Sequence, residues 1–111
     1  TSFNNKEYKK AAKLFKKEVK KNPNSIAKFW LARAYSNGNQ YHLAIPLYKE
    51  VIQKDDVEEA VHFSLNNLGT CYMHIKQYDS GIHYFLKAIE NKETDATPHY
   101  NLGLHYNKQS K

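Results

Sequence analysis

A pattern of leucine, glycine and tyrosine recurs along this chain at an interval of 34 residues. Leu68-Gly69 and Leu102-Gly103 lie 34 residues apart, as do Tyr72 and Tyr106, and Leu31-Ala32 begins a looser copy upstream. A fixed period of this length is typical of units that bury their hydrophobic faces only by stacking on their neighbours. The period therefore predicts an all-α stack of helical hairpins, and such stacks usually bind partners rather than catalyse reactions.

Each copy has a second part, in which an aromatic residue is followed by a small residue and then by another aromatic. The second parts are Tyr8, Ala11 and Phe15; Tyr41, Ala44 and Tyr48; and Tyr78, Gly81 and Phe85. Together the two parts resemble the tetratricopeptide repeat, which combines Leu-Gly-x2-Tyr with a later Ala-x3-Phe over 34 residues. The resemblance covers nearly all of Tyr8 to Tyr106. It implies an α-solenoid, a right-handed superhelical stack of antiparallel helix hairpins.

The period and the helix breakers predict six helices in a single domain. We place them near residues 3–21, 25–37, 41–54, 57–76, 78–91 and 96–109. On this division, residues 1–24 form the second helix of a partial repeat, residues 25–57 and 58–95 form two repeats, and residues 96–111 form the first helix of another. The chain is therefore expected to be a fragment of a longer protein.

The connections between these helices carry recognisable turn residues. Residues 22–25 should end the first helix and cap the second. Gly38 is available for a positive φ in the next turn. The interval from Tyr41 to Tyr78 is 37 residues rather than 34, so we expect the helix near 57–76 to be extended, with Asp55 or Asp56 as its cap.

The resemblance also implies where a partner would bind, because in this family the first helix of each hairpin lines a concave groove. Helical spacing from the motif then nominates partner-binding residues on three helices. They are Phe29, Trp30, Arg33 and Asn37; Asn66, Asn67, Thr70, Met73 and His74; and Tyr100, Asn101, Leu104 and Lys108. These residues make the groove aromatic and amide-lined, which suits an extended or helical peptide with apolar side chains.

Asn67 and Asn101 each precede Leu-Gly, where relatives carry an asparagine that holds an extended peptide. A carboxamide both donates and accepts, so it can satisfy the N–H and the C=O of one peptide unit. The alternative is that these asparagines bond neighbouring helices or merely follow the family pattern. The lysine that a carboxylate clamp would need near Asn66 or Thr70 is absent, so that type of recognition is disfavoured.

Charge is concentrated at the start of the chain. Residues 1–24 hold eight lysines against Glu7 and Glu18, whereas the remaining residues balance to zero. The simplest interpretation is a solvated outer face. The alternative is a contact with an acidic protein, anionic lipid or nucleic acid. Nucleic acid is the less favoured partner because Arg33 is the only arginine. A third hypothesis is a structural segment whose exposed end helices stack on missing repeats or on each other, the latter giving a homo-oligomer.

The sequence carries no signature of catalysis, metal binding or a cofactor. The six histidines include no pair at the spacing of a helical zinc site, and no phosphate-binding glycine loop or nucleophile elbow occurs. Cys71 stands where the previous copy has Ala34, so we expect a buried packing residue. No stretch approaches the roughly 18–20 apolar residues of a membrane span. We therefore predict a non-enzymatic protein with no cofactor, and we expect it in the cytoplasm.

Overall fold

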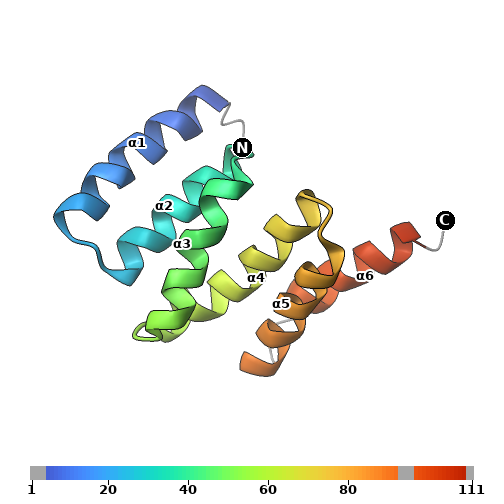
Figure 1. The fold of residues 1–111 in the computed structure, drawn as a ribbon. Coiled ribbons are helices and arrows are strands. Elements are labelled where there is room, and N and C mark those ends of the chain that lie inside the picture. Colours follow the sequence, from blue (N-terminus) through green and yellow to red (C-terminus); the bar gives the residue numbers. More distant parts are fainter. Residues whose placement is uncertain (1–4, 93–96, 110–111) are drawn as a thin grey trace.

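The computed structural model describes residues 5–92 and 97–109, which form six helices (Figure 1). The helices are α1 Asn5–Lys21, α2 Ser25–Asn37, α3 Tyr41–Lys54, α4 Glu58–His74, α5 Tyr78–Asn91 and α6 Thr97–Gln109. Each helix packs mainly against the next one along the chain, so α1 and α6 lie at opposite ends of the stack. The predicted all-α stack of hairpins is confirmed. The predicted extension of the first helix in the longer repeat is also confirmed, because α4 has 17 residues and α2 has 13.

The small residues of the repeat lie where two helices cross. Ala32 and Ala44 are both completely buried where α2 meets α3. At the α4–α5 crossing, a Cβ added to Gly69 would lie 2.7 Å from the ring of Phe85, closer than packed atoms allow. A side chain at Gly69 would therefore push the two helices apart. This steric limit explains why the repeat keeps alanine or glycine at these positions.

One hydrophobic core joins the α2–α3 hairpin to α4 of the next hairpin. Tyr48 is completely buried between α2, α3 and α4, in a cluster that also contains Phe29, Leu68 and Cys71. Burial raises the pKa of the Cys71 thiol to about 12. The thiol is therefore a neutral packing group, as its place in the repeat predicted. Fully burying an aromatic or leucine side chain is worth about 1.5–3 kcal/mol, so this cluster supplies much of the stabilisation of the stack.

The turns inside the hairpins use a left-handed residue, but not the expected glycine. Gly38 has a φ of −90°, and the positive φ belongs to Asn39 at 65°. In the next hairpin Lys76 takes the same conformation, also with a φ of 65°. The prediction for Gly38 was therefore wrong by one residue. Asparagine tolerates this conformation better than lysine, because its short polar side chain can bond locally.

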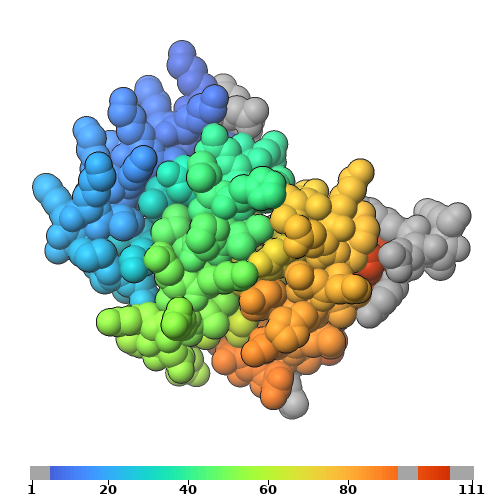
Figure 2. Space-filling model, in the orientation of Figure 1, coloured from blue at the N-terminus to red at the C-terminus, as the bar shows by residue number. Residues whose placement is uncertain are grey.

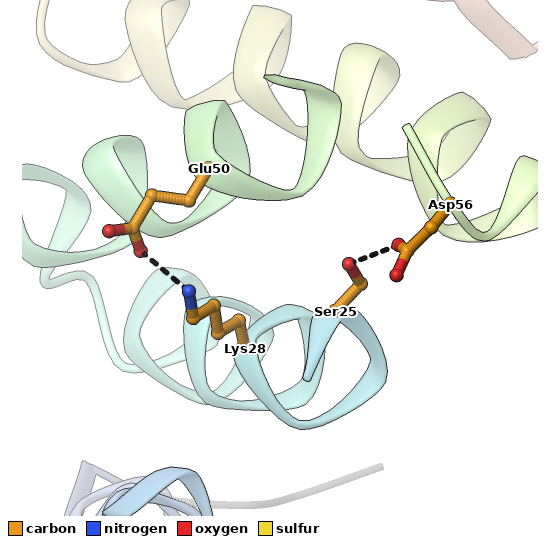
Figure 3. Close-up of polar contacts among 4 residues, drawn as sticks. All are labelled: Ser25, Lys28, Glu50 and Asp56. Atoms are coloured by element: carbon orange, nitrogen blue, oxygen red, sulfur yellow. Dashed lines mark hydrogen bonds and ion pairs between the residues drawn. The ribbon is translucent and has the colours of Figure 1, made fainter. Parts of the chain in front are cut away.

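The predicted cap of α4 was also wrong. Val57 precedes α4 and makes no capping bond, while Asp55 ends α3 in the left-handed conformation with a φ of 51°. Asp56 instead accepts a hydrogen bond of 2.5 Å from the Ser25 hydroxyl at the start of α2 (Figure 3). The carboxylate therefore ties the α3–α4 connection to α2. The predicted cap of α2 is confirmed, since Asn24 accepts from the Ala27 amide.

One face of the molecule is formed largely by α1, α3 and α5, which appear in blue, green and orange in Figure 2. All eight lysines of α1 are exposed to solvent. Across α2 and α3, Lys28 and Glu50 form an ion pair of 3.9 Å at the surface (Figure 3), a contact worth at most about 1 kcal/mol. Within residues 5–92 and 97–109, no helix has the length and apolar character needed to cross a bilayer.

Candidate partner-binding groove

Four neighbouring hollows run along the inner helices α2, α4 and α6. Adjacent hollows have walls in common, so they form one continuous depression, which we call the groove. The shared wall residues are Trp30, Arg33 and Asn37, then Ser36, Asn37 and Asn67, and finally Thr70 and His74. The groove begins beside α1, crosses α2 and α4, and ends against α6.

The section of the groove between α2 and α4 is apolar. It has a volume of about 460 Å³ and contains Ile26, Trp30 and Phe63 on its walls. These three side chains remain 53%, 42% and 48% exposed, although each belongs to a helix that packs into the core. Apolar side chains grouped at the surface are typical of a site that another molecule covers. We call this part the apolar section.

Helical spacing explains why these residues share a face. Ile26 precedes Trp30 by four residues on α2, and Phe63 precedes Asn67 by four residues on α4. Residues at this spacing are neighbours on one side of a helix. Bringing α2 and α4 together around Tyr48 therefore places Ile26 and Trp30 of α2 opposite Phe63 of α4 across the groove.

A single cation lies at the edge of the apolar section. The guanidinium carbon of Arg33 is 5.4 Å from the centre of the Trp30 ring, and Trp30 also makes an edge contact with Phe29 at 5.6 Å. Arg33 is exposed, so its donors remain open to solvent. A guanidinium over an indole combines a flat apolar surface with hydrogen-bond donors. Glu59 supplies a carboxylate on the opposite wall.

The floor of the groove is held by a tyrosine from the outer layer. Tyr48 reaches through from α3, and its hydroxyl lies 3.1 Å from the hydroxyl of Ser36. Burial raises the pKa of Tyr48 to about 12, although its contacts with Ser36 and Asn67 lower the pKa in part. The side chain of Asn67 therefore lies close to the Tyr48 hydroxyl at the floor of the groove.

The section between α4 and α6 is more polar. It has a volume of about 500 Å³, and Thr70, His74 and Asn101 contribute polar groups to its walls. The imidazole of His74 stacks on Tyr41 at 4.6 Å. Asn101 donates a 3.2 Å hydrogen bond to the amide oxygen of Asn66. That bond links α4 to α6 and uses one of the two N–H donors of Asn101. We call this part the polar section.

The structure gathers most of the predicted partner-binding residues along the groove. Those that line it are Phe29, Trp30, Arg33, Asn37, Asn67, Thr70, Met73, His74, Asn101 and Leu104. Phe29 belongs more to the core, because it is buried against Tyr48. Asn66 joins α4 to α6 rather than lining the hollows, and Tyr100 lies on the exposed surface of α6. The side chain of Lys108 lies outside the described residues.

Several groove residues were missed at the level of sequence. The most prominent are Ile26 and Phe63, and Val57 and Glu59 lie beside them. The four-residue spacing to Trp30 and Asn67 would have found Ile26 and Phe63. Glu59 stands four residues before Phe63, so the same spacing marks it. Val57 precedes α4 and had no such signal, because its position depends on how the α3–α4 connection is tied to Ser25. In the described part of the chain, no three histidine, cysteine or acidic side chains gather as metal ligands would.

The comparisons with known proteins agree with this architecture. Two models of the tetratricopeptide repeat match the chain, one over residues 3–59 and the other over residues 64–95. Between them they cover α1 to α5 and most of the chain. No curated protein matches it. With its repeated sequence pattern, its stacked hairpins and these two matches, the chain belongs to the tetratricopeptide repeat family.

Proposed function

We propose that this chain binds a partner protein by holding one segment of it along the groove. Repeats of this family generally mediate protein–protein interaction. The observation that supports the groove as the site is the exposed trio of Ile26, Trp30 and Phe63 facing one hollow from two helices. Such a trio would receive apolar side chains of the partner, while Arg33 and the nearby amides would bond its backbone or a carboxylate.

Trp30 allows this proposal to be tested directly, because it is the only tryptophan and lies in the apolar section. Random peptides displayed on phage can be selected on the protein, and the binders titrated while the indole fluorescence is followed. A peptide that covers the ring should shift the emission to shorter wavelength. We expect Phe63→Ala to weaken these peptides roughly tenfold or more, since it removes an aromatic anchor.

The matched control is Leu43→Ala together with Leu86→Ala. Both leucines are about as exposed as Phe63, but they lie on α3 and α5 and line none of the hollows of the groove. Their loss should leave peptide affinity unchanged. The groove would be rejected as the site if the selected peptides bound Phe63→Ala normally or lost affinity only with the control variant.

The amides can be tested separately from the apolar section. Asn67→Ala together with Asn101→Ala should weaken peptide capture without unfolding the protein, if the amides read the peptide backbone. Asn101 also bonds Asn66 and Asn67 lies close to the Tyr48 hydroxyl, so circular dichroism must accompany the binding measurement. Normal peptide affinity in the double variant would remove the amides from the site and leave the apolar section as the anchor.

A further inference from the structure

The lysines of α1 form a positive face that the groove does not use. At about 100° per residue, all of them lie within a sector of about 140° that is centred opposite Phe15. We call this sector the lysine face, and its members are Lys6, Lys9, Lys10, Lys13, Lys16, Lys17, Lys20 and Lys21. Tyr8 and Phe15, on the other side of α1, line the beginning of the groove. Figure 2 shows α1, in blue, along one edge of the molecule.

The acids of α1 lie outside the lysine face. Glu7 and Glu18 both fall beyond the sector, and Glu18 accepts a hydrogen bond from Asn22. Among the residues that the structure describes, none of the eight lysines forms an ion pair. Five pairs of these lysines stand four residues apart, a spacing at which like charges destabilise a helix. An anionic surface against this side of α1 would relieve that repulsion.

The exposure of the lysine face does not depend on where α1 lies in the stack. α3 is the second helix of the next hairpin and packs against helices on both sides. The seven lysines from Lys9 onward occupy repeat positions whose residues on α3 are all exposed as well. A further helix packed against α1 would therefore leave these lysines in solvent.

The fold itself does not require this concentration of charge. At the same seven repeat positions, α3 and α5 together carry three lysines and three acids, so their charges cancel. Those residues are Lys49, Lys54, Lys87, Glu50, Asp79 and Glu90. The outer side of a second helix can thus be solvated without any excess of lysine. The uniform charge of α1 indicates a negatively charged partner.

We propose that the lysine face binds a membrane surface rich in anionic lipid headgroups. A cluster of about four to eight basic residues on an amphipathic helix is typical of such binding. Protein interfaces are instead depleted in lysine and depend on aromatic and arginine anchors, and the lysine face contains neither. Nucleic-acid recognition favours arginine, whose planar guanidinium matches the geometry of phosphate, and α1 has no arginine.

Attachment through the lysine face would leave the groove accessible. The lysines and the groove-lining Tyr8 and Phe15 stand on opposite sides of α1. A partner protein could therefore occupy the groove while the chain lies on a membrane. Because membrane binding does not require the groove, Phe63→Ala should bind lipid as the wild type does.

Sedimentation with sucrose-loaded vesicles tests this assignment. Vesicles of phosphatidylcholine with about one-third phosphatidylserine should carry the wild type into the pellet at about 0.1 M salt, whereas pure phosphatidylcholine should not. Each lysine near an anionic surface strengthens binding about fivefold. Lys17→Gln together with Lys21→Gln should therefore weaken binding about 25-fold. At about 1 M salt, which shortens the screening length to about 3 Å, the wild type should stay in solution.

The matched control is Lys54→Gln together with Lys87→Gln. Lys54 occupies the repeat position of Lys21 on α3, and Lys87 occupies that of Lys17 on α5. Both double variants therefore lose the same charge from equivalent exposed positions, and the control should bind the vesicles as the wild type does. Circular dichroism should show both variants folded, because removing two like charges from α1 does not disturb a packed side chain.

Equal weakening by the two double variants would overturn the proposal, since attraction would then come from net charge and not from α1. A wild type that stays off the phosphatidylserine vesicles, or that stays bound at about 1 M salt, would also overturn it. Polyglutamate or double-stranded DNA, added at the negative charge of the vesicles, should displace little protein. Displacement of most of the protein by either polymer would assign the lysine face to an acidic protein or to nucleic acid instead.

Discussion

Gly69 and Gly103 occupy the same position of the repeat but should respond in opposite ways to alanine. Both lie inside a helix, where glycine is less favourable than alanine by about 0.8–1 kcal/mol. Their surroundings differ completely. An alanine at residue 69 would place its Cβ 2.7–3.0 Å from three atoms of the Phe85 ring, whereas at residue 103 it would meet nothing within 4 Å.

These distances set the expected magnitudes. Phe85 is 1% exposed and its ring lies directly on Gly69, so moving the ring would break buried contacts between α4 and α5. Forcing an extra carbon into a packed core costs about 1–3 kcal/mol, and the upper part of that range applies to a contact this close. After the gain in helix propensity, Gly69→Ala should lose about 1–2 kcal/mol of the free energy of unfolding. Gly103→Ala should gain up to about 1 kcal/mol.

Urea and thermal denaturation followed by circular dichroism would measure the Gly69 variant. A loss of this size lowers the melting midpoint by about 4–8 °C for a domain of this length. Because α6 packs less extensively on α5 and α4 than the inner helices pack on one another, the Gly103 variant also needs hydrogen exchange of the α6 amides, which should slow. If both substitutions shift stability in the same direction, the two environments do not differ as described.

Three further predictions concern single residues. Lys76→Gly should raise the free energy of unfolding by about 0.5–1 kcal/mol in urea titrations, because lysine is strained at a φ of 65°; a loss would refute the strain. Ser64→Ala should be neutral or stabilising by about 1 kcal/mol, since the buried Ser64 hydroxyl has no hydrogen-bond partner among the residues that the structure describes, and a clear loss of stability would contradict this. Raising the pH above about 9 should destabilise the protein, because Cys71 and Tyr48, both with pKa values of about 12, ionise in the unfolded chain first. Cys71→Ala should flatten that alkaline slope in urea titrations from pH 8 to about 11, and an unchanged slope would exclude the thiol as a contributor.

Helix positions were predictable because they follow from local patterns. All six helices lie within two residues of their expected bounds at each end, and Ala32 and Gly69 stand at the predicted crossings. The errors fall in the connections, where contacts between residues distant in sequence determine the backbone conformation and the capping partners. The local sequence does not show whether Asp56 caps α4 or accepts a hydrogen bond from Ser25. The choice depends on where α2 lies in the folded chain.

The same distinction separates the site residues that were found from those that were missed. Trp30 and Asn67 were nominated because they stand beside the leucine of the motif, and helical spacing then marks Phe63 as well. The same spacing marks Glu59, which stands four residues before Phe63. Val57 precedes α4, so helical spacing does not mark it, and its place beside the apolar section depends on the α3–α4 connection that Asp56 ties to Ser25.

The change in groove chemistry along the stack bears on how a partner would lie in it. Trp30 stands at the repeat position that Asn67 and Asn101 occupy in the later copies. The same position therefore presents an indole on α2 and an amide on α4 and α6. On the proposed function, a bound segment would place its apolar side chains between α2 and α4 and its polar groups near α6. A peptide and its reversed sequence should therefore differ in affinity, and equal affinity would mean that the groove does not select a direction.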